Sequence, residues 1–309
     1  MKRKYKRLIF MNHSNRFVFL SSQNELKIAE SDKIANVIAP RKFTDEFAIS
    51  SDDRVIAAIT KDHSVLVYDI LESRICFERE IKKSFHPCQI CITPNSDRIL
   101  IAGELFCARS GESVAQMLVI SLDSGQVYPN KLNRMLFGAA DCIGNDFFIA
   151  MRQIPSWTSI PHEPLFRILR WNDATHSFQQ ELEYDSAAFQ WEPVGFLDQG
   201  NEIQPIFHDD YNIYIGKKSI LSFENKVHHG VFIANVNIFV CYFECSILGI
   251  DICSKQVVFD IDFSGFDINP CFLSVQKDKK RLAFSSYENP RAFCTYILDE
   301  TDFKNSVEG

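Results

Sequence analysis

The stretch from Glu46 to Glu80, EFAISSDDRVIAAITKDHSVLVYDILESRICFERE, decides the fold class. It alternates short apolar segments, at 47–50, 55–60, 65–70 and 75–80, with polar turns. The second and third segments are almost continuously apolar, as expected of strands that neighbouring sheets cover on both faces. Four such segments joined by tight turns predict one four-stranded antiparallel sheet.

The same unit recurs along the chain, and the turn between its first and second strands can be aligned seven times. The aligned turns are marked by Arg16, Arg54, Arg98, Asp146, Glu202, Asn237 and Arg281. Successive markers lie 35 to 56 residues apart, which straddles the roughly 40 to 45 residues of a four-stranded propeller blade. The spacing therefore predicts an all-β chain of seven repeated sheets.

The third strand of the unit often ends in an apolar residue followed by a polar one, as in Tyr68-Asp69, Trp171-Asn172, Ile250-Asp251 and Leu298-Asp299. With the blade period, this pattern makes the chain similar to a divergent seven-bladed β-propeller of the WD40-like superfamily over residues 5 to 300. The Gly-His pair and the Trp-Asp dipeptide of typical WD40 repeats are missing, so their Asp–His relay is not carried over.

The resemblance implies a single seven-bladed β-propeller domain of four-stranded antiparallel blades spanning residues 1–309. The expected blades are 5–42, 43–83, 86–132, 138–185, 190–227, 230–264 and 268–307. With 27 Phe and only 12 Gly, the blades are expected to pack through aromatic side chains. A β-sandwich or two small β-domains are the alternative. The fourth strand of the last blade comes from either the tail 301–307 or the N-terminal segment 2–10.

Composition points to a folded, acidic protein. The chain has 309 residues, 46% of them hydrophobic, and a net charge of −7; disorder as the dominant state is excluded. Five basic residues lie within the first seven positions, which leaves 28 basic against 40 acidic residues in the remainder. An acidic surface repels phosphate backbones, so nucleic acid is not expected as a partner, whereas a basic protein is readily accommodated.

The cellular setting is expected to be cytoplasmic, without a membrane partner. The apolar run at 8–11 is too short for the core of a signal peptide, and no segment approaches the roughly 18 apolar residues of a spanning helix. The ten cysteines lie mostly inside apolar segments, which favours reduced, buried thiols.

Binding residues are expected on long loops, because a rigid scaffold presents them there. The connections between second and third strands lie on one rim, and two neighbouring ones are predicted to be long, at 104–114 and 155–164. The stretch Phe207–Tyr211 is expected at the corresponding place in the fifth unit. The candidate partner-binding residues are Arg109, Arg152, Trp157, His162, Trp191, His208, Asp209 and Tyr211. The alternative for Trp157 and Trp191 is packing over a blade edge.

Catalytic and metal chemistry find little support, and no cofactor is expected. His208 and Asp209 with His162 could be drawn as a metal site, but adjacent residues point in divergent directions. Cys88 and Cys91 have the spacing of a zinc or redox pair, yet positions three apart in a strand face opposite sides. Gly-x-Ser-x-Gly, a glycine-rich phosphate loop and HExxH are missing from the sequence.

These observations favour a non-catalytic protein–protein interaction scaffold that binds another protein, with basic charge, through the rim of blades three to five. A dedicated inhibitor, such as a bacterial immunity protein that masks a toxin, is one specific form, because an acidic surface speeds capture of a basic target. The first alternative is an enzyme or a small-ligand or metal binder that uses the central channel. The second is a structural subunit of a larger complex.

Overall fold

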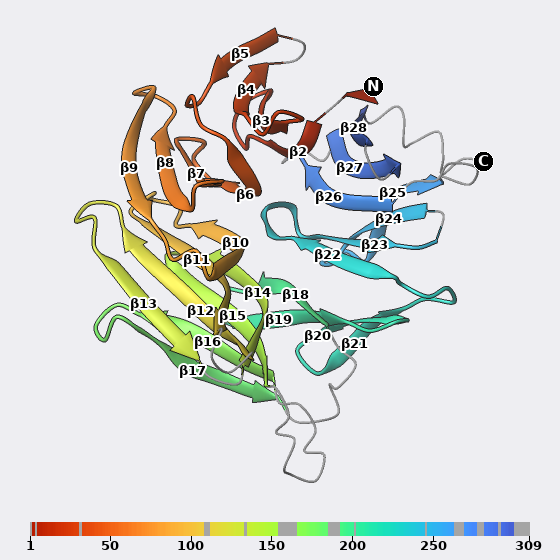
Figure 1. Cartoon of the computed structure of the whole chain (residues 1–309). Helices are drawn as coiled ribbons and strands as arrows, with labels where there is room; N and C mark the ends of the chain where they lie inside the picture. The colour runs from red at the N-terminus through yellow and green to blue at the C-terminus, as the bar shows by residue number, and fades with distance from the viewer. Residues whose placement is uncertain are drawn as a thin grey trace. The chain divides into compact units, whose positions relative to one another are not determined.

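The fold is all-β, a β-propeller built from seven four-stranded antiparallel blades (Figure 1). The predicted fold class is thereby confirmed. The computed structural model describes residues 2–3, 5–30, 33–107, 112–132, 135–153, 166–184, 192–200, 202–244, 246–262, 269–276, 281–289 and 292–299. Within these residues, no helix is long and apolar enough to cross a membrane.

The chain divides into two compact units, and the second, Glu46–Asp209, carries the features that matter most for function. Its sheets are β6–β9, β10–β13 and β14–β17, followed by the hairpin β18–β19. The strands are β6 Phe43–Ile49, β7 Val55–Thr60, β8 Ser64–Asp69, β9 Arg74–Glu80, β10 Phe85–Ile92, β11 Arg98–Cys107, β12 Glu112–Ser121, β13 Val127–Leu132, β14 Met135–Ile143, β15 Asp146–Gln153, β16 Phe166–Asn172, β17 Ser177–Tyr184, β18 Glu192–Asp198 and β19 Ile203–His208.

The first unit consists of Met1–Asp45 and Asp210–Gly309. Its strands are β1 Lys2–Arg3, β2 Tyr5–Phe10, β3 Arg16–Ser21, β4 Leu26–Glu30, β5 Lys33–Val37, β20 Asn212–Ile215, β21 Lys218–Ser222, β22 His229–Ile233, β23 Ile238–Tyr242, β24 Ser246–Asp251, β25 Gln256–Asp262, β26 Asn269–Val275, β27 Arg281–Asn289 and β28 Ala292–Asp299, and a 3-10 turn at Ala234–Val236 precedes β23.

The N-terminus of the chain completes the last blade. β1 pairs with β28, with Lys2 opposite Tyr296 and Arg3 opposite Thr295, so the sheet order is β26-β27-β28-β1. Of the two ways to supply the fourth strand, the N-terminal segment is therefore the one observed, and only its first residues take part. The alternative tail, 301–307, lies outside the described residues.

The seven aligned turns fall where the repeat requires them. Arg16, Arg98, Asp146 and Arg281 are each the first residue of the second strand of their sheet, and the other three markers directly precede that strand. A polar residue recurs there because the chain leaves a solvent-exposed turn at this point and enters a buried strand. The predicted repeat period therefore corresponds to the spacing of the observed sheets.

Beta-bulges also recur at matching positions. Five first strands carry one extra residue in their pairing with the second strand, at Lys6, Cys88, Gly138, Val194 and Cys271. A bulge increases the local right-handed twist of a strand pair. A bulge at the same position therefore increases the twist of the first strand pair in each of these five sheets.

The polar residues at the ends of third strands hold the following turns. At Asp69, Asn172 and Asp251, a side-chain oxygen accepts hydrogen bonds of 2.9 to 3.1 Å from backbone N–H groups of the turn that follows. Such bonds are typical of Asx turns. The residue at the position of the Trp-Asp aspartate therefore stabilises the turn of its own hairpin.

Aromatic packing between sheets is confirmed. The largest fully buried side chains are all phenylalanines: Phe17, Phe19, Phe43, Phe47, Phe85, Phe147, Phe166, Phe196, Phe207, Phe239, Phe259 and Phe284. In the second unit, one core cluster joins the β6–β9 and β10–β13 sheets and another joins β10–β13 to β14–β17. Each buried ring removes on the order of 150 to 250 Å² from water, so these contacts between sheets are a main source of stability.

Asp141, on β14, makes stability depend on pH. Burial raises its pKa to about 7, and the backbone N–H of Cys142, 2.8 Å away, offsets this only in part. The unfolded carboxyl ionises near pH 3.9. Between these values the folded state binds the extra proton, so Asp141 makes the free energy of unfolding fall as pH rises from about 4 to about 7.

Asp141→Asn should remove this contribution. We expect the stability of the wild type relative to the variant to fall by about 2 kcal/mol between pH 5 and pH 8. Urea unfolding of both proteins at the two pH values checks this, and histidine titration cancels in the difference. An equal difference at both pH values would mean that the folded Asp141 is already ionised at pH 5.

Candidate functional site

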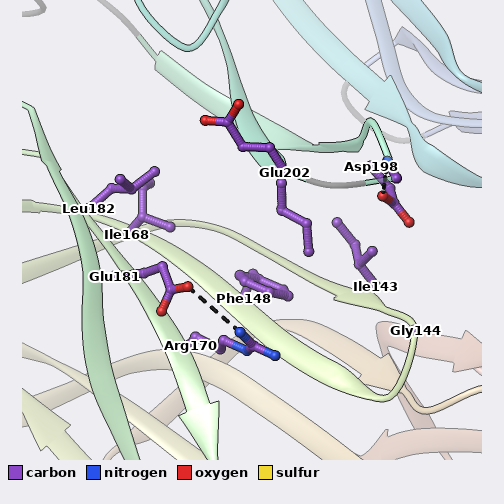
Figure 2. A pocket seen from close by; sticks show the side chains of 11 residues that line it. Ile143, Gly144, Phe148, Ile168, Arg170, Glu181, Leu182, Asp198 and Glu202 are labelled. Carbon is purple, nitrogen blue, oxygen red and sulfur yellow. Dashed lines mark hydrogen bonds and ion pairs between the residues drawn. The ribbon is translucent and has the colours of Figure 1, made fainter.

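A hollow of about 450 Å³ opens in the second unit, between the β14–β17 sheet and the β18–β19 hairpin (Figure 2). Residues from all six strands and from both hairpin turns line it: Ile143, Gly144, Phe148, Ile168, Arg170, Glu181, Leu182, Asp198, Gly200, Glu202 and Ile203. This volume is within the range of pockets that hold a ligand or a partner's side chains.

The floor of the hollow is apolar. Phe148 and Ile168 are 2% and 1% exposed, and the Phe148 ring lies 5.9 Å from that of Phe196 on β18. Ile143 and Ile203 are half-buried, while Leu182 remains 36% exposed at the outer side. An aliphatic side chain that is left exposed beside a buried floor offers area that a partner can remove from water.

A bulge places charge beside this floor. In the β16–β17 pairing, Ile168 faces Leu182 and Leu169 faces Gln180, which leaves Glu181 as the extra residue of β17. Consecutive residues of a regular strand point to opposite faces, but here Glu181 and Leu182 both line the hollow. The bulge therefore brings a carboxylate and an aliphatic group to the same side.

Arg170 is the one basic side chain among the lining residues. Its Nη2 and Nε donate to Asp146 Oδ2 at 2.5 and 3.2 Å, and its Nη1 lies 3.6 Å from Glu181 Oε1. The guanidinium carbon sits 5.7 Å from the centre of the Phe148 ring. The hydrogen bond to Asp146, followed by the charges of both carboxylates, raises the pKa of Arg170. The carboxylates of Asp146 and Glu181 therefore share one cationic partner, which neutralises this side of the hollow in part.

The opposite side carries Asp198 and Glu202, from the turn that joins β18 to β19 (Figure 2). Asp198 Oδ1 accepts the backbone N–H of Gly200 at 2.7 Å, and Glu202 Oε2 accepts Gln204 Nε2 at 2.9 Å. Among the described residues, no Lys, Arg or His forms an ion pair with either carboxylate. Burial and then the charge of Glu202 raise the pKa of Tyr184. The negative charge on this side is therefore not neutralised by a described residue of the chain.

A second, more polar hollow of about 310 Å³ shares Arg170 and Glu181 with the first. Its carboxylates have cationic partners in the chain, because Asp146 binds Arg170 and Asp173 pairs with Arg98. Arg98 also donates to the carbonyl of Asn145 at 2.8 Å. Arg98 thereby ties β11 to the turns of the neighbouring sheet, and the two arginines together neutralise the carboxylates of the second hollow in part.

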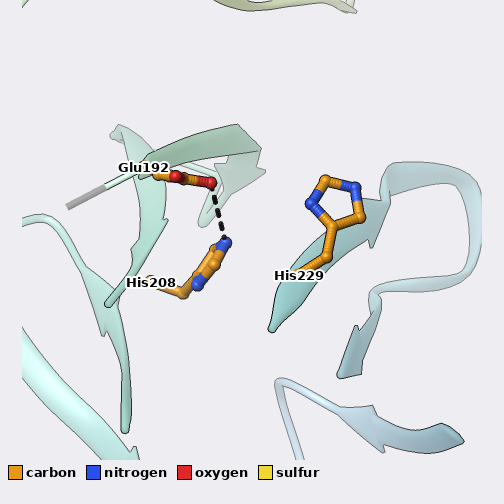
Figure 3. Close-up of side chains that lie close together, drawn as sticks. All are labelled: Glu192, His208 and His229. Carbon is orange, nitrogen blue, oxygen red and sulfur yellow. Dashed lines mark ion pairs between the residues drawn. The ribbon is translucent and has the colours of Figure 1, made fainter. Parts of the chain in front are cut away.

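At the other edge of the hairpin, His208 of β19 lies opposite Glu192 of β18 (Figure 3). The imidazole Nε2 is 3.5 Å from Glu192 Oε2, and Nδ1 lies 3.1 Å from the carbonyl of Asp209. The His208 side chain is 5% exposed, whereas that of Glu192 is 67% exposed. The histidine is held by its own hairpin and presents little surface to solvent.

The predicted partner-binding residues do not form one described surface. Arg109, Trp157, His162 and Trp191 lie outside the described residues, as does the loop at 155–164. Arg152 is a half-buried strand residue of β15, opposite Leu136 and Phe166. Asp209 and Tyr211 lie between β19 and β20, with Tyr211 48% exposed. Their roles as contact residues stay predictions.

Two predicted loops are strand in part, at 104–107 and 112–114 in the first and at 207–208 in the second, and the expectations were wrong at these residues. β11 and β12 remain paired as far as Cys107 opposite Glu112, because Leu105 and Val114 are buried in the core that joins two sheets. Likewise β19 extends through His208, and Phe207 is fully buried. Apolar residues that alternate with polar ones continue a strand when one face is covered.

Cys88 and Cys142 are not activated as nucleophiles. Cys88 is the bulged residue of β10 and is exposed, while Cys91 is buried, so the pair cannot share a metal. Partial loss of hydration, followed by the charge of a nearby carboxylate, raises the pKa of Cys88 to about 11 and that of Cys142 to about 12. The thiolate is the reactive form, so both thiols stay protonated and unreactive at neutral pH.

The hollow itself was missed from the sequence. Two of its acidic lining residues, Asp198 and Glu202, lie where the first strand of a blade connects to the second, and the third, Glu181, is the bulged residue of β17. Loop length predicted a binding surface at the opposite edge of the same sheets. The available signal was charge: the stretch DQGNE at 198–202 carries two acids in a turn and no basic residue.

The fold and the hollow define a β-propeller with an acidic, apolar-floored recess. No known protein family and no curated protein matches the sequence. Among solved structures, an oligogalacturonate lyase from Vibrio parahaemolyticus is similar with a TM-score of 0.65 and 10% identity, covering 97% of this chain and 91% of the lyase. The β-propeller domain of Cps50 (Swd1) from Myceliophteria thermophila is similar with a TM-score of 0.66 and 9% identity, covering 95% of each chain.

These likenesses show the fold alone, because identities near 10% carry no residue-level correspondence of function. One of the two neighbours is an enzyme and the other is a propeller domain. The function of this chain has to be argued from its own site.

Proposed function

We propose that the chain is a non-catalytic protein-interaction module that binds a basic segment of another protein. The observation that carries this proposal is the hollow beside β18–β19, where an apolar floor lies next to two carboxylates without a described cationic partner. A partner that supplies both positive charge and an aliphatic group would satisfy both features. The predicted partner class, a basic protein, agrees with this chemistry.

The charge of the whole chain supports the same partner. Acidic residues outnumber basic ones by 40 to 33, and a negative surface speeds the encounter with a basic protein. The same charge disfavours nucleic acid and anionic membranes, whose phosphates would be repelled. Electrostatics therefore favours the choice of a protein partner.

The proposal is non-catalytic because the best-placed reactive groups have structural roles. His208 is held within its hairpin by Glu192 and the carbonyl of Asp209, and the thiols of Cys88 and Cys142 are protonated. Loss of hydration raises the pKa of both thiols and does not activate them. We place this function in the cytoplasm, where the cysteines stay reduced.

A specific form of the proposal is a dedicated inhibitor that masks a basic toxin, as a bacterial immunity protein does. Such an inhibitor needs rapid capture and a partner of opposite charge, both of which an acidic recess serves. If this form holds, the captured partner is toxic when expressed alone and harmless when expressed with this chain.

Capture of a partner from native lysate tests the proposed function. Leu182→Arg places a positive charge at the exposed side of the hollow, so it should reduce recovery of a basic partner at least tenfold. Leu71→Arg is the matched control, because Leu71 is 78% exposed in the turn between β8 and β9 of the same unit. Quantitative mass spectrometry compares the three baits, and thermal unfolding verifies that they are equally folded.

The result that supports the proposal is a basic protein recovered with wild type and Leu71→Arg and lost with Leu182→Arg. The purified partner must then bind with the same order of affinities in calorimetry. Equal recovery by all three folded baits would place the binding surface elsewhere, and recovery of only acidic proteins would contradict the partner class.

A further inference from the structure

We propose that the hollow accepts a long basic side chain of the partner, Arg or Lys, and the aliphatic residue that follows it. The positive charge of Arg170 lies in the same hollow and lowers the affinity for the partner's basic side chain. This inference rests on the proposed function and names the chemistry recognised by the same site. The incoming cation lies against Asp198 and Glu202, and the aliphatic group covers Leu182 and Ile203.

The ion pairs around the two hollows indicate where the partner's basic side chain binds. Asp146, Glu181 and Asp173 have guanidinium partners in the chain, supplied by Arg170 and Arg98. Asp198 and Glu202 contact only a backbone N–H and a glutamine amide among the described residues. Both hydrogen bonds are to neutral donors, so Asp198 and Glu202 are the lining carboxylates that have no cationic partner among the described residues.

The apolar part of the hollow explains why the partner needs more than charge. The stem of an arginine or lysine is itself apolar and buries along hydrophobic surface while its head reaches a polar group. The half-buried Ile143 and Ile203 line the same hollow as the two carboxylates. An aliphatic neighbour then reaches Leu182, which is 36% exposed.

Arg170 shows how the hollow holds a guanidinium. It lies beside Phe148 and between two carboxylates, 3.6 Å from Glu181. Its charge repels a second cation in the same hollow and keeps Glu181 from contributing to the partner. Loss of Arg170 should therefore strengthen binding of a basic peptide, whereas loss of an ordinary contact residue would weaken it.

Fluorescence anisotropy with a short labelled peptide of repeating arginine, leucine and glycine tests the inference. Asp198→Asn combined with Glu202→Gln should weaken binding about tenfold, since each exposed ion pair contributes up to about 1 kcal/mol. Both substitutions keep the oxygen that accepts the existing hydrogen bond. Arg170→Gln should tighten binding about threefold, and higher salt should reduce all differences.

Matched controls separate local from general electrostatics. Glu80→Gln combined with Asp123→Asn removes two exposed acids of the same unit, outside the hollow, and should change affinity less than twofold. Peptides with citrulline for arginine or serine for leucine should each bind at least tenfold more weakly, because one removes the charge and the other the aliphatic contact.

Two outcomes overturn the inference while the proposed function stands. In the first, the partner captured from lysate binds the wild type but the peptide does not. In the second, the peptide binds but Arg170→Gln weakens it, or the Asp198 and Glu202 substitutions have no more effect than the control pair. If wild type recovers no partner and binds no peptide, the proposed function fails together with the inference.

Discussion

Replacing Phe207 by alanine should lower the free energy of unfolding by about 3 to 5 kcal/mol, the usual cost of removing a buried phenylalanine. The Phe207 ring is fully buried on β19 and lies 5.5 Å from the rings of both Phe166 and Tyr184, with edge-to-face geometry. These contacts join the β18–β19 hairpin to the β14–β17 sheet. The substitution therefore also loosens the wall of the hollow. Urea unfolding at equilibrium measures the change.

Two comparisons make this result specific. Phe207→Leu retains most of the volume and should cost about half as much. Tyr211→Ala removes an aromatic ring that is 48% exposed and should change stability by less than about 1 kcal/mol. If Phe207→Ala costs no more than Tyr211→Ala, then Phe207 is a loop residue, as the sequence first suggested, and the described strand is wrong.

Gly103→Ala should destabilise the protein by about 3 kcal/mol, because the added methyl group has no room. A Cβ at Gly103 would lie 2.1 Å from the carbonyl oxygen of His86 and 2.9 Å from Pro87 Cα. These atoms are backbone next to the β10 bulge, so a change of rotamer cannot relieve the clash. Either the ladder between β10 and β11 shifts or the strands separate.

Gly144→Ala is the matched control for Gly103→Ala. A Cβ at Gly144 meets no atom within 4 Å, but the residue has a φ of 57°. Only the cost of left-handed backbone applies, about 1 kcal/mol. Thermal and urea unfolding should therefore rank the two variants clearly. A cost for Gly103→Ala as small as that for Gly144→Ala would contradict the close approach of β11 to the bulge.

The seven-sheet architecture was predictable because each turn interrupts an apolar strand with polar residues at a regular interval. Arg98 and Asp146 mark the start of second strands both in the sequence pattern and in the structure. The packing through phenylalanine was equally predictable from composition. Period and composition are properties of the whole chain, so single irregular loops do not obscure them.

The site was less accessible to sequence reasoning, for two physical reasons. First, the hollow combines β15–β17 with the turn before β19, and one bulge at Glu181 decides which residues face it. Register and bulges depend on pairing between strands and not on local sequence. Second, an acidic side chain forms an ion pair only if Arg98 or Arg170, each on a different strand from its partners, lies close enough to contact it. The segment 104–114 misled for a related reason, because pairing between two long strands buries Leu105 and Val114 against a neighbouring sheet.

Site-specific photocrosslinking from the hollow tests the central claim most directly. Leu182 is replaced by p-benzoylphenylalanine, and Leu71 by the same residue as the control, before irradiation in native lysate and identification of the crosslinked peptides by mass spectrometry. We predict that position 182, and not position 71, crosslinks to one protein within a segment that carries Arg or Lys beside an aliphatic residue. A partner that crosslinks at position 71 alone, or an acidic crosslinked segment at position 182, would contradict the assignment of the hollow as the binding surface.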